Sequence, residues 1–582
     1  MKTIRVISIS ILSLLAILFF VSSAIAGSVI VEPTLLCVDG TAYAFKNLKP
    51  GDTVKLKGGA RPYLLIRNFT GSLSKPMVFI NYNGPVTINT DWYYGIVFRN
   101  CKYIKMTGTG YINNYYGFMI TRVLGGAGLS IGDLSSYTEI DHVYIDNVAT
   151  AGIYAKTDPD CSLTSTRDKF TQYNTIIHDC FVGHTGDEGF YVGSSFYSGK
   201  TLACNGKDTV VLPHLMDGVR IYNNIVTYTG WDGIQVGSAS KNCQIFNNVV
   251  MYDSQDGTNY QMSGILIGGG SQCDCYNNYI AKGKGDGIES LGLGDYRIFN
   301  NIIVDAGRTY YPNDPTKMKY GIYVNDNSAR PGSSFSILFN DILNPKSNGI
   351  RFSSDVSRMN LIASNAIISP GQGSTGYIVV TCLGSNVTVK NNYLALNSGG
   401  AGFIDTLYRL NPNSPLVDNG YTDARRVNFD FFNHQRPVGT RYDIGSYEYD
   451  PLHPNGSVRG EEVEPLDLTD SSRSHFSVDP VPFPNPVNKN LTITYTIDEP
   501  SNVELIIYDM RGSGFYHEDQ NNQSAGEHFF KVDTASFPEG VCLFSIRTNE
   551  HTYTVNSIKS KSRLAVFKLV PDLLKISGHF FN

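Results

Sequence analysis

Seven short phrases, in each of which a glycine precedes an apolar residue, place mainly aromatic, polar and charged side chains at matching positions. The glycines are Gly152, Gly189, Gly233, Gly264, Gly287, Gly321 and Gly349. The residues two places after them are Tyr154, Tyr191, Gln235, Leu266, Glu289, Tyr323 and Arg351. If the phrases stack in register, these residues form an outward-facing column with neighbours about 4.8 Å apart. Tyrosine rings beside charged groups suit a sugar chain, because aromatic faces stack on apolar sugar faces and cations meet acidic groups.

The residues that immediately precede these glycines form a second column, which we call the acidic column. They are Ala151, Glu188, Asp232, Ser263, Asp286, Tyr320 and Asn348. Glu188 and Asp232 would lie on consecutive turns of the stack and could bind Ca²⁺, a hard cation that prefers carboxylate oxygens. The alternative for this column is structural, namely turn capping and hydrogen bonding at the edges of the turns.

The two columns contain the groups that a lyase of uronic-acid glycans requires. Such an enzyme needs a base for the proton beside a uronate carboxylate and a positive group that neutralises this carboxylate in the transition state. Lys156, at the next outward position after Tyr154, or Tyr191 could be the base. Arg167 or Arg351 could neutralise the carboxylate, and Ca²⁺ could assist. The residues expected to contact the sugar chain are Tyr154, Gln235, Glu289 and Tyr323.

Two other functions remain open for the same residues. A glycosidase would use paired carboxylic acids, for which Asp187, Glu188 and Asp232 are available, with His184 and His214 nearby in the sequence. A surface protein without catalytic activity, which binds glycans or acts as an adhesin, would need only an exposed sheet face with tyrosines. No run of residues matches a family's catalytic motif, so these roles rest on spacing alone.

A repeated asparagine phrase identifies the scaffold that must position these residues. It occurs as IYNNI at 221–225, IFNNV at 245–249, CYNNY at 275–279, IFNNI at 298–302, LFNDI at 338–342 and VKNNY at 389–393. The first asparagines of the first five copies are spaced by 24, 30, 23 and 40 residues. A period in the low twenties with loop insertions indicates a solenoid. His178 stands at the place of an asparagine in an earlier copy, where we expect a structural role.

The alternating phrases favour a right-handed parallel β-helix as the solenoid. Apolar and polar residues alternate after each glycine, so one side chain faces the core and the next faces out. A leucine-rich repeat would need a fixed leucine lattice, and a propeller would need about 40 residues per blade. We therefore expect an all-β fold in which one buried ladder contains Ile153, Phe190, Ile234, Ile265, Ile288, Ile322 and Ile350.

The N-terminus and the composition indicate an exported protein. Lys2 and Arg5 precede an apolar run, and small residues end at Ala26, which predicts a signal peptide over residues 1–26. The chain has 582 residues, 57 of them glycine and 37 tyrosine, and only 17% are charged. Its net charge of -5 gives no footprint for nucleic acid, which usually needs a basic face. We expect a monomer.

Ten cysteines in an exported chain permit disulfide bonds. Cys161 and Cys204 bracket a loop-rich stretch and are the pair we expect to be joined. Zinc is not expected, because the Cys-Asp-Cys run at 273–275 has the wrong spacing. The insertion over 193–217 would form one wall of a groove. The cysteines expected to be small buried residues with free thiols are Cys101, Cys180, Cys243 and Cys382.

Residues near both ends of the solenoid resemble known β-helix proteins. The segments PGDTVKL at 50–56 and SKPMVFI at 74–80 resemble the opening coils of right-handed β-helix proteins, including the chondroitinase B-like and alginate lyases. This resemblance implies the fold and says little about the reaction. The segments NSPLVD at 413–418 and DIGSYE at 443–448 resemble the closing module of bacterial β-helix domains. The β-helix is therefore expected to span residues 27–450.

The C-terminal part resembles the sorting domain of the type IX secretion system. The motifs are FPNPV at 483–487, VELIIYD at 503–509, GEH at 526–528 and FPEGV at 537–541. Residues 451–475 are polar and acidic and are expected to form a linker. The alternation around Leu505 and Ile507 independently predicts a small β-sandwich over residues 476–561. The resemblance implies export through the periplasm of a Bacteroidetes-type bacterium, by the type IX machinery, to the medium or the outer-membrane surface. Residues 562–582 continue beyond the usual end of such a domain, and their role stays open. The expected partners are this machinery and an extracellular polysaccharide.

Overall fold

The computed structural model describes the chain in segments. Its regular secondary structure consists almost entirely of β-strands. The described residues are 27–383, 386–405, 407–422, 427–451, 490–497, 499–509, 512–533, 537, 540–548, 552–560 and 563–567. The predicted signal peptide and nearly all of the predicted linker lie outside them. Within these segments, no helix is both long and apolar enough to cross a membrane.

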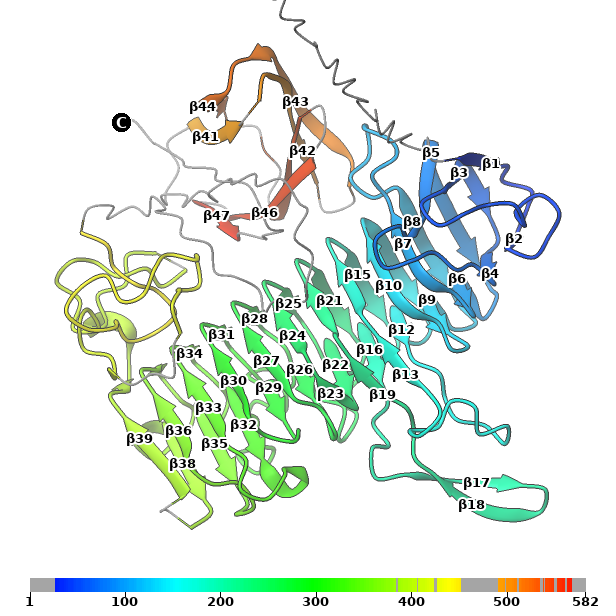
Figure 1. The fold of residues 1–582 in the computed structure, drawn as a ribbon. Helices are drawn as coiled ribbons and strands as arrows, with labels where there is room; N and C mark the ends of the chain where they lie inside the picture. Colours follow the sequence, from blue (N-terminus) through cyan, green and yellow to red (C-terminus); the bar gives the residue numbers. More distant parts are fainter. Residues whose placement is uncertain are drawn as a thin grey trace, which may run out of the picture.

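Residues 28–395 form a parallel β-helix, which confirms the predicted fold (Figure 1). From β7 (Lys102–Thr107) onward each complete coil contains a first, a second and a third strand, whereas the long strands β3 (Thr53–Arg61) and β5 (Met77–Thr90) span the first and second positions of their coils. Strands of one kind pair with their equivalents in the next coil. The third strands form a 12-stranded sheet. They are β2 (Cys37–Asp39), β4 (Leu64–Arg67), β6 (Tyr94–Arg99), β9 (Ala127–Gly132), β12 (Ile153–Ala155), β16 (Phe190–Gly193), β22 (Ile234–Gly237), β26 (Ser263–Ile267), β29 (Asp286–Ser290), β32 (Ile322–Asn325), β35 (Ile350–Ser353) and β38 (Ile378–Thr381).

The first and second strands together form a 23-stranded sheet. The first strands are β1 (Ser28–Val31), β3 (Thr53–Arg61), β5 (Met77–Thr90), β7 (Lys102–Thr107), β10 (Ser136–Asp141), β14 (Thr175–His178), β20 (Arg220–Tyr222), β24 (Cys243–Phe246), β27 (Cys273–Tyr276), β30 (Tyr296–Phe299), β33 (Phe335–Leu338), β36 (Asn360–Ala363) and β39 (Val387–Lys390). The second strands are β8 (Phe118–Val123), β11 (Val143–Val148), β15 (Phe181–Thr185), β21 (Ile225–Thr229), β25 (Val249–Met251), β28 (Tyr279–Ala281), β31 (Ile302–Val304), β34 (Asp341–Leu343), β37 (Ala366–Ile368) and β40 (Tyr393–Ala395).

The third strands carry the predicted apolar ladder in the predicted register. Ile153 pairs with Phe190, Phe190 with Ile234, and the order continues without a shift to Ile350. All seven ladder side chains are completely buried. A glycine precedes each ladder residue because the backbone of the next coil passes so close that a Cβ atom would not fit. A Cβ atom on Gly233, for example, would lie 2.5 Å from the carbonyl oxygen of Gly264.

An asparagine ladder stabilises the corner between the first and second strands. The Nδ2 group of Asn224 donates to Oδ1 of Asn248 at 3.0 Å, and Asn248 donates in the same way to Asn278. The ladder continues through Asn301, Asn340, Asn365 and Asn392. Each amide also satisfies backbone groups of the turn, so these asparagines are structural.

Two positions in this repeat differ from the sequence-based register. Asn340 is hydrogen-bonded to Asn301, the second asparagine of the preceding copy. The spacing of 40 residues was counted from the first asparagine, Asn300, so it compared two positions that are not equivalent. Phe339 takes the left-handed position at φ 54° instead. His178 does not stand at an asparagine position either. It pairs with Tyr222 in the strand register and stacks on that ring at 4.7 Å between centroids, so it begins an aromatic ladder.

The insertion after β16 folds into an arm that a disulfide bond holds. The hairpin of β17 (Lys200–Cys204) and β18 (Lys207–Val211) extends beyond the coils in Figure 1. Cys161 and Cys204 are joined as predicted. A small parallel sheet at the base of the arm contains β13 (Thr171–Tyr173), β19 (Leu215–Asp217) and β23 (Ala239–Lys241).

The expectation of a free thiol at Cys243 is wrong, because this residue is bonded to Cys273. The two cysteines are partners in the pairing of β24 with β27, and this register brings their sulfur atoms together. Cys101 and Cys180 are free and buried as expected, whereas Cys382 is free but only partly buried.

The C-terminal domain consists of two antiparallel sheets, as expected for a small sandwich. One sheet contains β41 (Asn490–Ile497) and β44 (Gly526–Asp533). The other has the order β43 (Gly514–Gln523), β42 (Ser501–Tyr508), β45 (Gly540–Arg547), β46 (Thr552–Ser560) and β47 (Arg563–Phe567). The last strand shows that the residues after 562 begin by extending the sheet. The domain contacts the β-helix where Tyr508 donates to the carbonyl oxygen of Ile112 at 3.1 Å.

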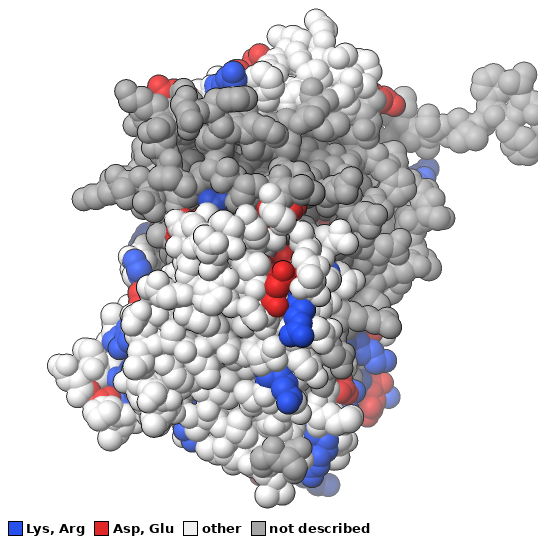
Figure 2. Space-filling view, turned by 90° about the vertical axis from the view of Figure 1, so that its left-hand side faces the viewer, with Lys and Arg blue, Asp and Glu red and all other residues white. Residues whose placement is uncertain are grey.

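The end of the molecule at which β39 and the closing module lie carries few charges. Figure 2 shows Lys, Arg, Asp and Glu scattered over a mainly uncharged face, without a broad basic patch. Below that surface, the closing module packs Leu410, Leu416 and Tyr447 against second-strand residues such as Ile302 and Ile368.

Candidate functional site

The outward column of the third strands is continuous, as the sequence predicted. Tyr154 pairs with Tyr191, Tyr191 with Gln235, and the register then runs through Leu266, Glu289, Tyr323 and Arg351. We call these seven residues the site column. Its centre is covered, because Gln235 and Leu266 are only 2% and 7% exposed. The partly exposed tyrosines Tyr154, Tyr191 and Tyr323 therefore flank a buried centre.

Glu188 and Asp232 of the acidic column converge on the side-chain amide of Gln235. With its amide nitrogen turned toward them, Gln235 donates to Oε1 of Glu188, Oδ2 of Asp232 and Oε1 of Gln261, each at 3.2 Å. The opposite amide orientation places the Gln235 oxygen 3.2 Å from each of these three oxygen atoms. Gln261 was missed by the sequence analysis, because it lies in a turn insertion two residues before the matching column position.

The two carboxylates are buried without a full set of partners. Glu188 is 1% and Asp232 0% exposed. Oε2 of Glu188 and Oδ1 of Asp232 accept no hydrogen bond from any described residue. Burial raises the pKa of Glu188 to about 7 and raises the pKa of Asp232 well above its usual range, with the charges of Glu289 and Glu188 adding to the effect on Asp232. Such a pair requires protons or a cation.

Lys156 lies beside this pair, on the two tyrosines of the site column. Its Nζ is 4.0 Å from the ring centroid of Tyr191 and 5.5 Å from that of Tyr154, and it forms an ion pair with Asp158 at 3.2 Å. The hydroxyl of Tyr191 is hydrogen-bonded to Ser195 at 2.7 Å. Burial raises the pKa of Tyr154 to about 12. A cation held over aromatic rings next to buried carboxyls can bind and orient an acidic sugar.

A second acidic group follows two coils further along the column. Oε2 of Glu289 accepts from the hydroxyl of Ser263 at 2.8 Å, and Asp286 forms an ion pair with Lys319 at 3.1 Å. Burial and the charge of Asp286 raise the pKa of Glu289 to about 7. Glu289 is thus mostly enclosed. Lys319 was not singled out from the sequence, although it directly precedes the column residue Tyr320.

The two arginines considered as neutralising groups occupy different places. Arg351 lies 5.6 Å from the ring of Tyr320 and is four coils from Gln235, which corresponds to about 20 Å. Arg167 lies 4.2 Å from the ring of Tyr197 and donates to the Tyr197 carbonyl oxygen at 2.5 Å, so it fastens the arm. Neither is joined to the Glu188 and Asp232 pair by a described contact, and their roles stay predictions.

The histidines near the site in sequence lie apart from the carboxylate pair. His184 is stacked on Tyr228 at 5.0 Å and hydrogen-bonded to Asp146 at 2.8 Å on the second-strand side. The Nε2 atom of His214 accepts from the backbone NH of Thr157 at 3.1 Å. The structure therefore brings together Tyr154, Lys156, Glu188, Tyr191, Asp232 and Gln235, leaves His184 outside, and places His214 beside the backbone that follows Lys156.

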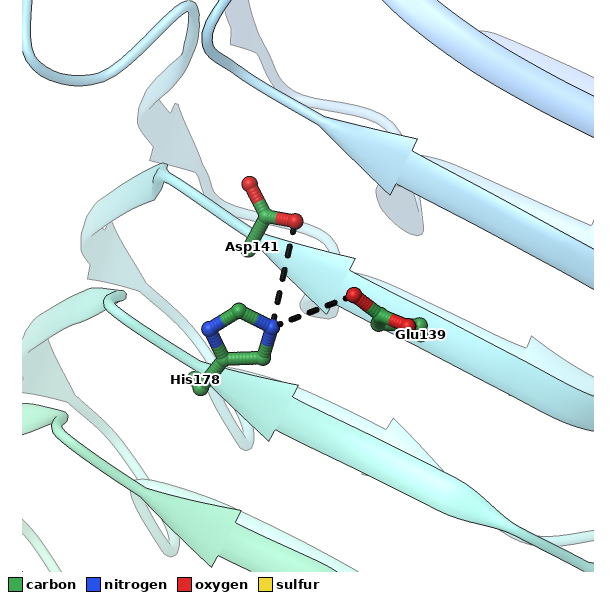
Figure 3. A group of neighbouring side chains, drawn as sticks. All are labelled: Glu139, Asp141 and His178. Atoms are coloured by element: carbon green, nitrogen blue, oxygen red, sulfur yellow. Dashed lines mark hydrogen bonds and ion pairs between the residues drawn. The ribbon is translucent and has the colours of Figure 1, made fainter. Parts of the chain in front are cut away.

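Another cluster that could hold a metal ion lies on the first strands (Figure 3). Glu139, Asp141 and His178 place ligand atoms within 4.8 Å of one another. The Nδ1 atom of His178 is bound to Asp179 at 2.6 Å, which turns Nε2 toward Glu139 at 3.4 Å and Asp141 at 3.9 Å. In metal sites a carboxylate often binds one ring nitrogen of a histidine and so directs the other nitrogen at the metal.

Lys105 already supplies positive charge to this cluster. Its Nζ is 2.5 Å from Glu139 and 3.3 Å from Asp141. Against the opposing effect of burial, hydrogen bonds to Asp179 and Glu139 raise the pKa of His178 to about 9. A metal ion would have to displace the Lys105 ammonium and the His178 proton. The cluster is best described as a network of ion pairs that stabilises three coils.

Comparison with known families identifies the C-terminal domain. Residues 482–560 match the family model of the secretion system C-terminal sorting domain. The sorting domain is therefore confirmed. It indicates secretion with attachment at the cell surface, and it implies the type IX secretion machinery as a partner.

Comparison with solved structures finds parallel β-helix polysaccharide lyases. An alginate lyase from Paenibacillus sp. is 16% identical, over 56% of this chain and 98% of that chain, with a TM-score of 0.37. The pectate lyase Pel9A is 12% identical, over 73% and 98%, with a TM-score of 0.37. The family PL6 alginate lyase AlyGC is 17% identical, over 78% and 62%, with a TM-score of 0.39. No curated protein sequence matches the chain.

Proposed function

We propose that this protein is a secreted or surface-attached lyase of a uronic-acid-containing polysaccharide, with its site on the third strands of the coils from β12 to β22. One observation supports this proposal above the others. The buried carboxylates of Glu188 and Asp232 each retain an oxygen without a partner and converge with two glutamine amides beside Lys156. Buried, incompletely paired acids next to partly exposed aromatic and cationic side chains are typical of functional sites.

The oxygen atoms around Gln235 fit a divalent cation, for which Ca²⁺ is the proposed ion. Carboxylate and amide oxygens are hard ligands of the kind that Ca²⁺ selects. Glu188, Asp232, Gln235 and Gln261 would hold it. When bound, such an ion would supply positive charge for the carboxylate of a uronate.

Residues of the site column would bind and orient the sugar chain. The coil spacing of about 4.8 Å places successive tyrosines and polar groups along an extended glycan. Tyr154 and Tyr191 would receive sugar faces, while Lys156 would contact a uronate carboxylate or accept the proton beside it. In the elimination, this proton leaves carbon 5, the glycosidic bond at carbon 4 breaks, and a double bond forms between the two carbons.

Glycoside hydrolysis is a second candidate, supported by the raised pKa values of the pair. A carboxyl whose pKa is about 7, such as that of Glu188, can act as a general acid near neutral pH. Hydrolysis would use the same two residues as the acid and its partner. The products separate the two reactions, because only elimination creates an unsaturated sugar.

The test is a panel of acidic polysaccharides incubated with the full chain, with and without a chelator. Ultraviolet absorbance of unsaturated products together with new reducing ends, both abolished by the chelator and restored by Ca²⁺, would support the lyase. Reducing ends without absorbance would support a hydrolase. Binding with neither signal would contradict both enzymes and favour the adhesin alternative.

A further inference from the structure

A further ladder, made of turn residues, runs along the ends of the second strands, separate from the site column. Each of its members has a left-handed φ between 45° and 60°. They are His184, Tyr228, Tyr252, Lys282, Asp305, Asn344 and Ser369. The rings of the first three are stacked, at 5.0 Å and 4.7 Å between centroids. The ladder therefore changes from aromatic to polar and charged side chains at Lys282.

A cavity opens where this change occurs. It has a volume of about 690 Å³ and is lined by ladder residues and by the turns that follow them. The residues important here are Tyr252, Lys282, Lys284, Asp305, Arg308 and Asn344. Its volume is in the range of sites for small organic ligands and exceeds that of a single inorganic anion. Figure 1 shows β25, β28, β31 and β34, from which these turns start, in a row separate from β22, β26 and β29.

Three cationic side chains line the cavity without acidic partners. Nζ of Lys284 donates to the carbonyl oxygen of Gln255 at 2.5 Å, and Nε of Arg308 donates to that of Asn344 at 2.8 Å. Nζ of Lys282 lies 5.9 Å from the Tyr252 ring centroid. Within the described chain, no salt bridge connects any of the three to an acidic side chain. Carbonyl contacts orient a cation but leave its charge uncompensated.

The acidic residue in the cavity is occupied elsewhere. Oδ1 of Asp305 accepts from Nδ2 of Asn344 at 2.5 Å, and the same Asn344 side chain also contacts Arg308. One negative charge therefore faces three positive charges. The lining attracts anions, and its one aromatic ring, that of Tyr252, continues into the stacked ring of Tyr228 outside the cavity, along which an extended chain of sugars would enter.

We propose that this cavity is a second binding site for an acidic saccharide, which holds a carboxylate- or sulfate-bearing unit of a glycan away from the site column. The identity of the glycan rests on the proposed function, whereas the anionic character of the ligand rests on Lys282, Lys284 and Arg308. The site would keep a long chain attached while another part of it occupies the site column. Two linked contacts raise the overall affinity without new contacts at either one.

The test removes the three charges and measures binding to polymers. The variant Lys282→Ala/Lys284→Ala/Arg308→Ala is compared with Lys49→Ala/Lys102→Ala/Lys390→Ala, which removes three exposed positive charges elsewhere on the β-helix. Affinity electrophoresis with alginate, polygalacturonate and chondroitin sulfate, and with a neutral glucan, is run at low salt. Thermal unfolding verifies that both variants are folded.

We expect the cavity variant to bind its acidic polymer about tenfold more weakly or worse, and the control variant to change less than about twofold. Equal binding by both variants would overturn the second site. Displacement of the polymer by inorganic sulfate as effectively as by acidic oligosaccharides would overturn the saccharide assignment.

Turnover separates this proposal from the proposed enzyme. If the cavity variant loses polymer affinity while the wild-type chain degrades no substrate, the second site stands and the enzyme fails. If the second site serves the enzyme, the variant will show a raised KM for polymer and an unchanged kcat on short oligosaccharides.

Discussion

Glu188 and Asp232 lie on consecutive coils, and their carboxylates contact the same side-chain amide of Gln235, at 3.2 Å each. This relationship places two buried acids on one side of the solenoid, next to Lys156, which lies on the partly exposed rings of Tyr154 and Tyr191. The geometry agrees with the convergence expected from the sequence, while the catalytic and metal roles stay predictions. Protons and cations can each neutralise such a pair, so they compete for it.

The first prediction concerns Ca²⁺ and pH. The pKa of Glu188 is raised from 4.5 to about 7 by burial, so the folded state keeps a proton that the unfolded state releases. The free energy of unfolding should therefore fall as the pH rises from about 4.5 to about 7. Bound Ca²⁺ replaces the proton, so it should raise the Tm strongly at pH 8 and little at pH 5. Thermal unfolding with Ca²⁺ or a chelator measures both effects.

Glu188→Gln is the matched variant for this prediction. It should lose the stabilisation by Ca²⁺ and show a shallower fall of stability with pH, because the glutamine side chain cannot ionise. An equal rise of the Tm with Ca²⁺ in this variant and in the wild type would place the cation elsewhere.

The second prediction concerns the cluster around His178. The pKa of this imidazole is raised from 6.5 to about 9 in the folded state, so its contribution is complete below pH 6.5 and is lost as the pH rises through about 9. Wild-type stability should fall between these values, and His178→Gln should remove much of that fall. Chemical unfolding from pH 6 to 10 measures it, with the exposed His184→Gln as control. A pH dependence that the His178 variant retains unchanged would contradict the network.

The third prediction separates a base from an aromatic platform. Lys156→Ala should lower turnover by about 10²–10⁴-fold if Lys156 is the base, whereas Tyr191→Phe should leave stacking intact. Initial rates on the active polysaccharide give the comparison. The opposite result, with a large loss in Tyr191→Phe alone, would assign the base to Tyr191. Small and equal effects would remove both residues from the chemistry.

The fourth prediction tests the buried ladder. Ile288 is completely buried between Ile265 and Ile322, so Ile288→Ala should cost about 2–5 kcal/mol. Because each coil contacts only its neighbours, hydrogen exchange should increase mainly in β26, β29 and β32. Uniform loss of protection along the whole β-helix would show stronger coupling than this architecture implies.

The fifth prediction concerns export. A chain that lacks residues 476–561 should remain in the periplasm with a folded β-helix, because the sorting domain is the address. Fractionation of cells with an antibody against the β-helix measures the location. Normal appearance of the truncated protein in the medium would contradict the role of this domain.

The sequence alone determined the solenoid, the register of the third strands and the columns. The Gly-apolar phrases align because a Cβ atom at the glycine would strike the next coil, as at Gly233. The alternation after each glycine then decides which side chains face the core. These rules are local and repeat in every coil. Seven phrases were therefore enough to place the residues from Tyr154 to Arg351 in one column.

Only the tertiary structure decided what fills the irregular turns. Gln261 and Lys319 come from insertions of different length, whose conformations no repeat constrains. Asn340 occupies the position of the second asparagine of the other copies, where the amide of Asn301 donates to it. His178 joins an aromatic ladder, because it stacks on Tyr222 of the next coil. The pairing of Cys243 with Cys273 likewise depends on which coils become neighbours. Burial of Glu188 and Asp232, and with it their raised pKa values, arises from turns packing over the sheet, which spacing along the chain does not reveal.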